Sequence, residues 1–249
     1  MAETQTQAPA SAPPSSTLTP NPDPAAPLSA AEVFDSVGPA YEDAFAGLAT
    51  QAAALQWLLT QLPAGGGGSV LDVGCGTGRP AASVLADAGH DVLGIDVSPA
   101  MIAAARERVP NARFELADVR TYLAQDTPDK DGLLDAVTIF FSLIADVTQA
   151  DIRAVLAGLA RRLKPGGTLV FSTVPLPVEN AAIRWMGRPL LASSLAPDEA
   201  LAAVAAAGLD VVNHTLTTFT PHAAEVGLCG PDEVWEETHL FVYAKKPLA

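Results

Sequence analysis

The feature that most constrains this chain is a glycine-rich turn, the run DVGCGTG at residues 72–78, which joins two segments of different hydrophobic period. Ser69–Val73 is a short apolar run typical of a buried strand, and Pro80–Ala88 has the pattern of a helix that ends at Gly89. Glycines at such a junction let the backbone turn tightly and approach a ligand, and the helix start adds outward N–H groups. The turn therefore indicates a ligand site, with an ordinary strand-to-helix connection as the alternative.

The rest of the chain repeats this alternation of strand and helix. Further strands are expected at Asp91–Ile95, Ala112–Leu116, Leu133–Phe141 and Thr168–Thr173, and helices at Pro99–Arg108, Thr148–Leu163 and Asp198–Ala207. No helix separates Asp210–Thr220 from Val234–Ala244, so these two segments are expected to form an antiparallel pair. We therefore predict an α/β fold. It is a doubly wound, mostly parallel seven-stranded sheet with one antiparallel strand near the C-terminus and helices on both faces.

The length of 249 residues fits one such domain. Residues 1–28 are rich in Ala, Pro, Ser and Thr and carry almost no large apolar side chain, so they are expected to form a disordered tail. The domain is expected to span residues 29–249, with Ser29 as the N-cap of a first helix. A second helix is expected at Asp43–Leu62, ended by Pro63 and the glycines after it.

Charge and cysteine content exclude several classes of function. The formal net charge is −14, which repels nucleic-acid backbones and anionic membranes. No stretch reaches the ~18 consecutive apolar residues of a membrane span, and the N-terminus lacks the features of a secretory signal. The two cysteines, Cys75 and Cys229, have neither disulfide-framework nor zinc-ligand spacing. A cytoplasmic protein without a metal site is therefore expected.

Acidic residues near the turn indicate which ligand the turn binds. A dinucleotide-binding turn requires glycine at position 79, where this chain has Arg79, and Asp72 would repel a pyrophosphate but attract an ammonium group. Asp96 ends the second strand, where a ribose-binding carboxylate belongs, and Asp118 after the third strand could accept a hydrogen bond from an adenine amino group. A turn-forming role is the alternative for Asp118.

The ordered series VLDVGCGTG at 70–78, GIDVS at 94–98, Asp118 and LKPGG at 163–167 resembles the motifs of class I S-adenosylmethionine-dependent methyltransferases. The resemblance implies S-adenosylmethionine as cofactor, with S-adenosylhomocysteine as product. It implies that one set of residues contacts the methionine moiety, the ribose and the adenine of the cofactor. These are Asp72, Gly74, Cys75, Gly76, Asp96, Val97, Met101, Asp118, Val119 and Phe140.

The acceptor side resembles small-molecule members of this class. The segment after the fourth strand, IFFSLI at 139–144, lacks the Asn-Pro-Pro-Tyr-like motif of enzymes that methylate nucleic-acid amino groups or protein amides. Its apolar side chains, including Phe141 and Leu143, favour a small, fairly hydrophobic acceptor. The segment 34–42 resembles the N-terminal lid of such enzymes, and Tyr41 is placed to cover the sulfonium region. An insert at 179–195, with Trp185 and Met186, is expected to form a substrate lid, although plain packing is the alternative for Tyr41 and for the insert.

Histidine is the candidate for a general base. His222 lies in the loop between the last two strands and is the best exposed of the four, whereas His90, His214 and His239 are expected to be structural. Many such enzymes need no base. A relative that catalyses a non-methylating step and a regulatory protein that binds S-adenosylmethionine remain open alternatives. The sequence does not indicate the acceptor atom or the oligomeric state.

Overall fold

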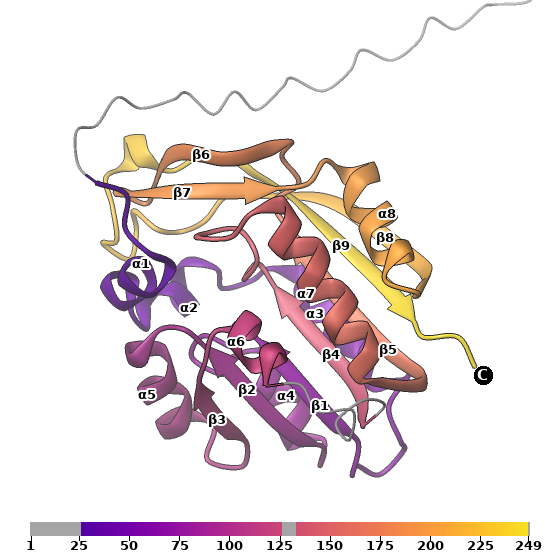
Figure 1. The fold of residues 1–249 in the computed structure, drawn as a ribbon. Coiled ribbons are helices and arrows are strands. Elements are labelled where there is room, and N and C mark those ends of the chain that lie inside the picture. The colour runs from indigo at the N-terminus through magenta and orange to yellow at the C-terminus, as the bar shows by residue number, and fades with distance from the viewer. Residues whose placement is uncertain (1–25, 126–132, 249) are drawn as a thin grey trace, which may run out of the picture.

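A seven-stranded sheet forms the centre of the molecule, whose computed structural model describes residues 26–125 and 133–248. The strand order is β3-β2-β1-β4-β5-β9-β8 (Figure 1). The strands are β1 Ser69–Val73, β2 Asp91–Asp96, β3 Arg113–Leu116, β4 Leu134–Phe140, β5 Leu163–Thr173, β8 Asp210–Phe219 and β9 Glu237–Lys245. Strands β1 to β5 pair in parallel, and β9 runs antiparallel to both β5 and β8. The predicted fold class, with one reversed strand near the C-terminus, is confirmed.

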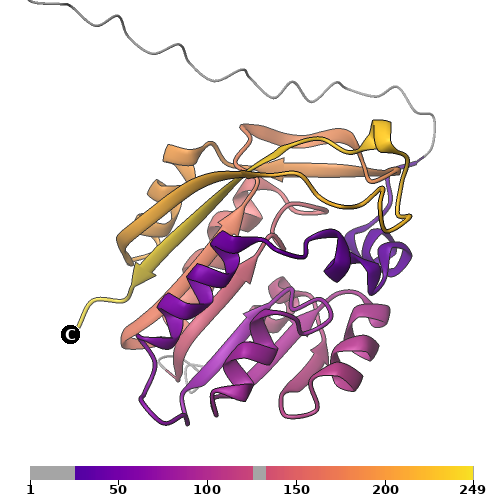
Figure 2. The same ribbon diagram turned by 180° about the vertical axis from the view of Figure 1, so that it is seen from behind.

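Helices cover both faces of this sheet (Figures 1 and 2). One layer consists of α3 Ala49–Leu59, α4 Ala81–Asp87 and α5 Pro99–Arg108, and the other of α6 Val119–Ala124, α7 Gln149–Arg162 and α8 Pro197–Ala206. Successive strand side chains point to opposite faces, so Val70 packs in the core beneath α3–α5 and Leu71 in the core beneath α6–α8. The strands are thus buried on both sides, as parallel sheets generally are.

The strand directions gather many chain segments at one edge of the sheet. Parallel strands β1, β2, β4 and β5 all end at this edge, and β9 begins there because it runs the opposite way. Its first residues therefore lie beside the end of β5, with Leu240 opposite Thr173, and beside the end of β8, with Glu237 opposite Phe219. Residues from the beginning of β9 can consequently share a site with residues that follow β1, β2 and β4.

Two pairs of short elements lie over this edge (Figure 1). The first pair is α1 Ala30–Val37 and α2 Ala40–Ala44. Ser29 caps α1, because its Oγ accepts from the amide of Glu32 while the Glu32 carboxylate accepts from the amide of Ser29, as predicted for this N-cap. The second pair is a separate hairpin of β6 Val178–Trp185 and β7 Arg188–Ser194, which accounts for the insert at 179–195.

The hairpin turn consists of Met186 and Gly187, with φ angles of 46° and 77°. Positive φ at both central residues is the signature of a type I′ turn, which matches the twist of the two strands. Glycine adopts this conformation freely, but methionine at the first position departs from the usual Asn-Gly and Asp-Gly sequences. The sequence therefore gave no clear sign of a hairpin.

The helix predicted at Asp43–Leu62 is wrong in extent. Helix α2 already includes Asp43 and ends at Ala44, and α3 begins only at Ala49 and ends at Leu59. The break contains Gly47, whose φ of 81° is incompatible with a continuous helix. Helix α6 was not predicted, because six residues are too few to show a helical period.

The tail predicted at residues 1–28 lies outside the described residues as far as residue 25. The amide of Leu28 donates to the carbonyl of Pro189 at 2.9 Å, and Leu28 forms a bridge with Leu190. The fold therefore includes at least one residue before the expected boundary at Ser29. Among the described residues, no helix combines the length and the apolar character needed to cross a membrane.

Arg188 joins the elements that cover the edge. Its Nε donates to Ser36 Oγ at 2.9 Å and its Nη2 to the Ser36 carbonyl at 3.2 Å, at the end of α1. Its Nη1 donates to the carbonyls of Met186 in the hairpin turn and of Leu228, the latter at 2.7 Å. One guanidinium thus connects α1, the hairpin and the loop between β8 and β9.

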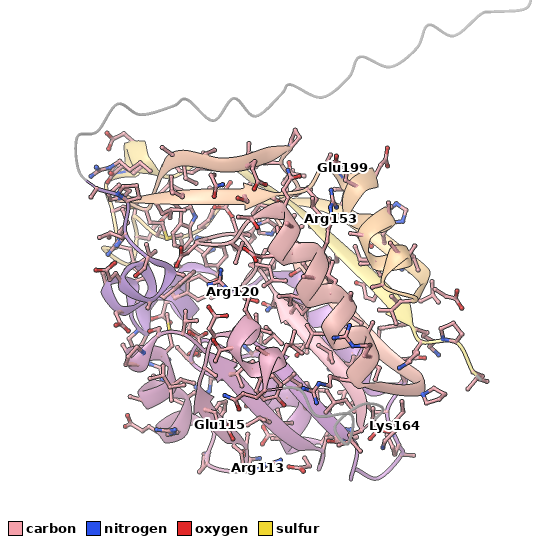
Figure 3. The ribbon with its side chains drawn as sticks, viewed as in Figure 1. Arg113, Glu115, Arg120, Arg153, Lys164 and Glu199 are labelled. Carbon is pink, nitrogen blue, oxygen red and sulfur yellow. The ribbon has the colours of Figure 1, made fainter. Side chains whose placement is uncertain are left out.

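Replacing this guanidinium should loosen the hairpin without unfolding the sheet. Arg188→Met keeps the apolar part of the side chain and removes its donors, so amide exchange in β6 and β7 should become about tenfold faster, equivalent to ~1.4 kcal/mol of local stability. Hydrogen exchange followed by mass spectrometry measures this. Arg153→Met, on the exposed side of α7 (Figure 3), is the control and should leave hairpin exchange unchanged. Equal rates in all three proteins would show that Arg188 does not hold the hairpin.

Candidate cofactor site

A cavity opens at the carboxyl edge of the sheet and encloses about 1090 Å³ of empty space, counting the part open to solvent. Its walls come from the glycine turn, the ends of β2 and β4, and helices α1 and α2. The predicted site residues that line it are Tyr41, Asp72, Gly74, Cys75, Gly76, Asp96, Val97, Met101, Val119, Phe140, Phe141 and Leu143. Asp118, Trp185, Met186 and His222 are not among its lining residues.

Two glycines allow the turn to form one wall of this cavity. Gly74 has a φ of 66°, and a Cβ on it would lie 2.0 Å from the Cβ of Ser142, which follows β4. Gly76 has a φ of 53°, and a Cβ there would meet no atom within 4 Å. The first glycine therefore permits the close approach of the two loops. The second leaves backbone exposed toward the cavity.

Asp72 is a buried carboxylate with one unused oxygen. It ends β1 beside Thr138 of β4, and Thr138 Oγ1 donates to Asp72 Oδ1 at 2.7 Å. Asp72 Oδ2 is also buried and has no hydrogen-bond partner. Burial, together with the nearby charge of Asp96, raises the pKa of Asp72 to about 6 against the hydrogen bond from Thr138. An ammonium group in the cavity would supply the missing donor and the missing charge.

Asp96 is held more firmly at the end of β2. Its Oδ2 accepts from the amide of Gly76 and its Oδ1 from the amide of Ser98, both at 2.9 Å. Burial raises the pKa of Asp96 and these backbone donors oppose the rise. Each carboxylate oxygen has two lone pairs, so the group can still accept bonds from a ligand's hydroxyls. The same hydrogen bonds fix the glycine turn against the start of α5.

Apolar side chains lie next to Asp96 on the side predicted to hold an adenine. Ser98 caps α5 by accepting from the amide of Met101 at 3.1 Å, and Met101 is fully buried on the first turn of that helix. Val97 and Val119 also line the cavity. The residues assigned to the methionine moiety, the ribose and the adenine thus follow one another along a single cavity.

Asp118 departs from this arrangement because Arg120 engages its carboxylate. Arg120 Nη2 donates to Asp118 Oδ2 at 2.6 Å, and the amide of Arg120 donates to Asp118 Oδ1 at 2.7 Å at the start of α6. The guanidinium also donates to the carbonyl of Asp146 and lies 3.7 Å from Asp151. Hydrogen bonds from Arg120 lower the pKa of Asp118 despite partial burial. Contact between Asp118 and an adenine stays a prediction.

Helix α1 is fastened to the cofactor side of the cavity by Asp35. Its Oδ1 accepts from Ser98 Oγ at 2.6 Å and from the amide of Ala100 at 3.0 Å. These donors belong to the first turn of α5, where a carboxylate is favoured by the unpaired N–H groups and by the helix dipole. Helix α1 and the end of β2 therefore meet at the start of α5.

Helix α2 is fastened by Glu42. Thr77 Oγ1 in the glycine turn donates to Glu42 Oε2 at 3.0 Å, and Arg108 at the end of α5 pairs with the same oxygen. Arg79, the residue that replaces the third dinucleotide glycine, lies 3.7 Å from Glu42. Asp35 and Glu42 are functional residues that sequence reasoning missed. The available signal was their acidic character within the segment recognised as a lid.

Aromatic rings from four segments close the cavity. We call Phe34, Tyr41, Phe45 and Trp185 the aromatic lid. Its ring centroids lie 5.8 Å apart for Phe34 and Tyr41, 4.7 Å for Tyr41 and Phe45, and 6.4 Å for Phe45 and Trp185. Phe219 of β8 stacks on Phe45 at 5.9 Å. Trp185 thus belongs to the lid through its neighbours, although it does not itself line the cavity.

Met186 and Tyr41 were also expected on the acceptor side, and of the two only Tyr41 lines the cavity. Met186 is buried against Ala44 and Ala223 and lines a separate small hollow that also includes Glu237. Burial, followed by the charges of Glu237 and Asp96, raises the pKa of Tyr41 well above its usual range. The Tyr41 phenol therefore keeps its proton at neutral pH and can donate a hydrogen bond but not remove a proton.

The histidines are arranged differently from the sequence-based expectation. His222 is exposed, its amide donates to the carbonyl of Ala44 at 2.8 Å, and its ring stands against Phe219 outside the cavity lining. A role for His222 as a base stays a prediction that this placement does not favour. His239 is fully buried at the start of β9 and pairs with Glu237. Sequence reasoning had assigned it only a structural role in the sheet.

A model of the methyltransferase domain family matches residues 70–167. The match begins in β1, includes the glycine turn with both buried carboxylates, and ends within β5. The resemblance to class I methyltransferases, and with it an S-adenosylmethionine-binding fold, is thereby confirmed for this methyltransferase domain.

Proteins with similar sequences are methyltransferases. The chain is 40% identical to the demethylmenaquinone methyltransferase of Beutenbergia cavernae over 123 residues, which make up 47% of this chain and 46% of that protein. It is 36% identical to the trans-aconitate 2-methyltransferase of Variovorax paradoxus over 116 residues, or 46% of this chain and 41% of that protein. The chain spans about half the length of the curated relatives it matches.

The fold extends beyond the segment that these relatives share. The crystal structure of the [4+2]-cyclase SpnF superposes with a TM-score of 0.61 at 21% identity and covers 88% of this chain and 96% of the cyclase. At this level of identity the likeness establishes the fold alone. It includes the lid and the C-terminal strands as well as the methyltransferase domain.

The two glycines of the turn should respond differently to a methyl group. Gly74→Ala forces a positive φ and a collision with Ser142, so the free energy of unfolding should fall by about 3 kcal/mol. Gly76→Ala has only the positive φ to accommodate and should lose about 1 kcal/mol, while its methyl group enters the cavity and weakens S-adenosylhomocysteine binding. Urea unfolding and calorimetry measure the two effects. Equal destabilisation by both variants would contradict this account of the turn.

The unused oxygen of Asp72 should make the ligand-free protein less stable at neutral pH. Because the folded-state pKa of about 6 exceeds the unfolded value of 3.8, the native state holds a proton that the unfolded state releases, and stability falls as pH rises from about 4 to 6. Asp72→Asn keeps the acceptor for Thr138 and cannot ionise. At pH 8 the ligand-free variant should be more stable than wild type by on the order of 2 kcal/mol.

The same variant should lose the cofactor. Calorimetry at pH 8 should show S-adenosylhomocysteine binding to Asp72→Asn at least tenfold more weakly than to wild type, because a buried charge-assisted hydrogen bond is removed. The control is Asp135→Asn, on β4 at the far end of the sheet next to Lys164, which should bind normally. A variant that gains stability but binds normally would remove Asp72 from the methionine site.

Proposed function

We propose that this chain is an S-adenosylmethionine-dependent methyltransferase that acts on a small, hydrophobic metabolite. One observation carries the proposal: a buried carboxylate with an unpartnered oxygen, Asp72, shares a cavity with Asp96 and with a wall of aromatic side chains. The first two features suit a ligand with an ammonium group and vicinal hydroxyls. The third suits an apolar acceptor.

Different residues at the cofactor end would bind different parts of the ligand. Asp72 Oδ2 would accept from the ammonium group of the methionine moiety, and the free lone pairs of Asp96 would accept from the ribose hydroxyls. Val97, Met101 and Val119 would flank the adenine. Asp118 would reach its amino group only if the contact with Arg120 rearranged, so Val119 and its backbone are the better supported partners there.

The acceptor end is apolar. Phe141 and Leu143 line the cavity beyond the methionine end, and the lid residues Phe34, Tyr41 and Phe45 face them. Anionic acceptors would lose their hydration here and would be repelled by the nearby carboxylates. The net charge of −14 likewise disfavours nucleic acid as acceptor.

Methyl transfer requires little chemistry from the protein itself. S-adenosylmethionine, when bound, supplies a methyl group already activated on a sulfonium sulfur. The chain's contribution is to align an acceptor atom with that methyl and to keep water away. Asp35 and Glu42 hold α1 and α2 closed over the cofactor side, and the aromatic lid excludes water from the acceptor side.

Incubation with methyl-labelled S-adenosylmethionine and fractionated hydrophobic metabolites tests the proposal. Labelled product that forms only with wild type would support it. Conversion of a metabolite without uptake of label would point to a non-methylating enzyme on the same fold. Tight S-adenosylhomocysteine binding without conversion of any metabolite would point to a regulatory protein.

Asp96 offers a sharper test of the cofactor assignment. Asp96→Ala should weaken S-adenosylhomocysteine binding at least tenfold, a loss of ~1.4 kcal/mol or more for a charged hydrogen-bond partner. The matched control is Asp91→Ala at the opposite end of β2, where the side chain is exposed and pairs with Arg113 (Figure 3). Calorimetry should show no change for this control. Equal affinities of Asp96→Ala and wild type would remove Asp96 from the ribose site.

A further inference from the structure

A carboxylate and an imidazole are buried together at the start of β9. His239 Nε2 lies 3.0 Å from Glu237 Oε2, and the two residues are 0% and 7% exposed. They are two residues apart on one strand, so both side chains point to the same face of the sheet. That face is the one covered by α3, because Phe241, two residues further on, packs in the core beneath α3–α5.

The pair lies beside the cavity, on the acceptor side. Thr138 and Phe140 of β4 share its face of the sheet, and β9 begins at the edge where β4 ends. The Phe141 ring stands 4.4 Å from the His239 ring and also forms part of the cavity wall. Phe219 of β8 stacks on the imidazole with the ring centroids 6.1 Å apart. His239 thus contacts two rings, of which that of Phe141 lines the cavity.

The hydrogen bond to Glu237 fixes the tautomer of the imidazole. A carboxylate can only accept, so Nε2 carries the proton and donates it to Glu237. Nδ1 is then left with a lone pair, and this atom is buried with no hydrogen-bond partner among the described residues. An unpaired buried acceptor destabilises the folded state, and a purely structural histidine gives no reason for that cost.

Glu237 is itself oriented by the lid. Trp185 Nε1 donates to Glu237 Oε1 at 3.0 Å, so the two carboxylate oxygens serve one donor each. The chain Trp185–Glu237–His239 joins the hairpin to the sheet. When the aromatic lid is in place, the carboxylate that sets the tautomer of His239 is in place as well.

We propose that His239 is the general base of this enzyme, oriented by Glu237, and that the acceptor atom is therefore the oxygen of an alcohol or a phenol. The inference rests on the proposed methyltransferase function and names its substrate class. Amines and thiols reach a nucleophilic form near neutral pH without a dedicated base, whereas a hydroxyl oxygen is a weak nucleophile until its proton is removed. A base of fixed tautomer in an apolar pocket is what a hydroxyl requires.

The reaction balances without a further reactant. The bond between the methyl carbon and the sulfonium sulfur breaks as the bond between that carbon and the acceptor oxygen forms. The hydroxyl proton passes to Nδ1, which leaves an imidazolium paired with the Glu237 carboxylate, and the proton returns to solvent on product release. His239 is not among the residues that line the cavity, so the hydroxyl would reach Nδ1 only when the Phe141 ring turns aside. Phe141 has a φ of 57°, an unfavourable backbone conformation of the kind found at ligand clamps and switches.

The tautomer can be measured without any turnover. In protein labelled with ¹⁵N at histidine and saturated with S-adenosylhomocysteine, the His239 resonances should show a protonated Nε2 and an unprotonated Nδ1. Addition of 2-naphthol should shift the Nδ1 resonance, and 2-methoxynaphthalene, which lacks the hydroxyl proton, should not. A protonated Nδ1, or no response to 2-naphthol, would overturn the proposal.

Glu237→Gln makes the test specific to orientation. The indole of Trp185 can only donate, so it takes the amide oxygen and turns the NH₂ group toward His239 Nε2. Nδ1 should then carry the proton, with reversed ¹⁵N shifts, and turnover should fall by about 10² to 10⁴ although the protein stays folded. His239→Asn should lose the same factor, and the exposed His214→Asn on β8 should lose none. A Gln variant with the reversed tautomer and normal turnover would refute the role of the pair.

The position of the transferred label separates this inference from the function on which it rests. All four proteins should bind S-adenosylhomocysteine alike in calorimetry, because the pair is not part of the cofactor site. Label found on nitrogen, sulfur or carbon of the product would overturn the hydroxyl acceptor and leave the methyltransferase proposal standing. Bound cofactor with no labelled product from any acceptor would overturn both.

Discussion

The burial of two carboxylates side by side, at the ends of β1 and β2, is the constraint on which the site depends. Asp72 and Asp96 are held by the Thr138 hydroxyl and by backbone amides of the glycine turn and of the α5 start. Hydrogen bonds orient such groups but supply no positive charge, and the charge of Asp96 raises the pKa of Asp72. In the folded chain these two carboxylates thus lack a positively charged partner, which a cationic ligand would supply. Stability given up there is what allows selective binding.

The covering elements depend on the same region. Asp35 of α1 and Glu42 of α2 bind donors on α5 and on the glycine turn, which are the elements that position Asp96. The hairpin is linked instead to the acceptor side, through the contact of Trp185 with Glu237. Arg188 then joins the two coverings to each other. The polar contacts of α1 and α2 are therefore separate from that of the hairpin, and the two coverings are joined by Arg188 and by the stacking of Trp185 on Phe45.

The sequence predicted which side chains meet at the carboxyl edge of β1 and β2, because the determinants of their placement are local. A strand, a turn and a helix follow one another within residues 69–101, and parallel neighbours end at a common edge, so Asp72 and Asp96 could be placed together. Asp118 shows the limit: whether its carboxylate faces a ligand or Arg120 depends on side-chain geometry, not on spacing. His222 was favoured for its exposure, which also put it outside the cavity. Glu237 and His239 follow the glycine turn by more than 150 residues, and only the reversed direction of β9 brings them to the site.

The reversed strand has a consequence for how such a protein can diversify. The segment that matches the family model ends at residue 167, whereas the N-terminal helices, the hairpin and the first residues of β9 lie outside it. A strand's first residues hang on a loop that can lengthen, shorten or mutate without shifting the register of the sheet behind it. The two halves of the pocket therefore differ in how much sequence change they tolerate. Selection can rewrite the acceptor half while the nucleotide half is kept, and a lineage can acquire a new substrate without rebuilding its cofactor chemistry.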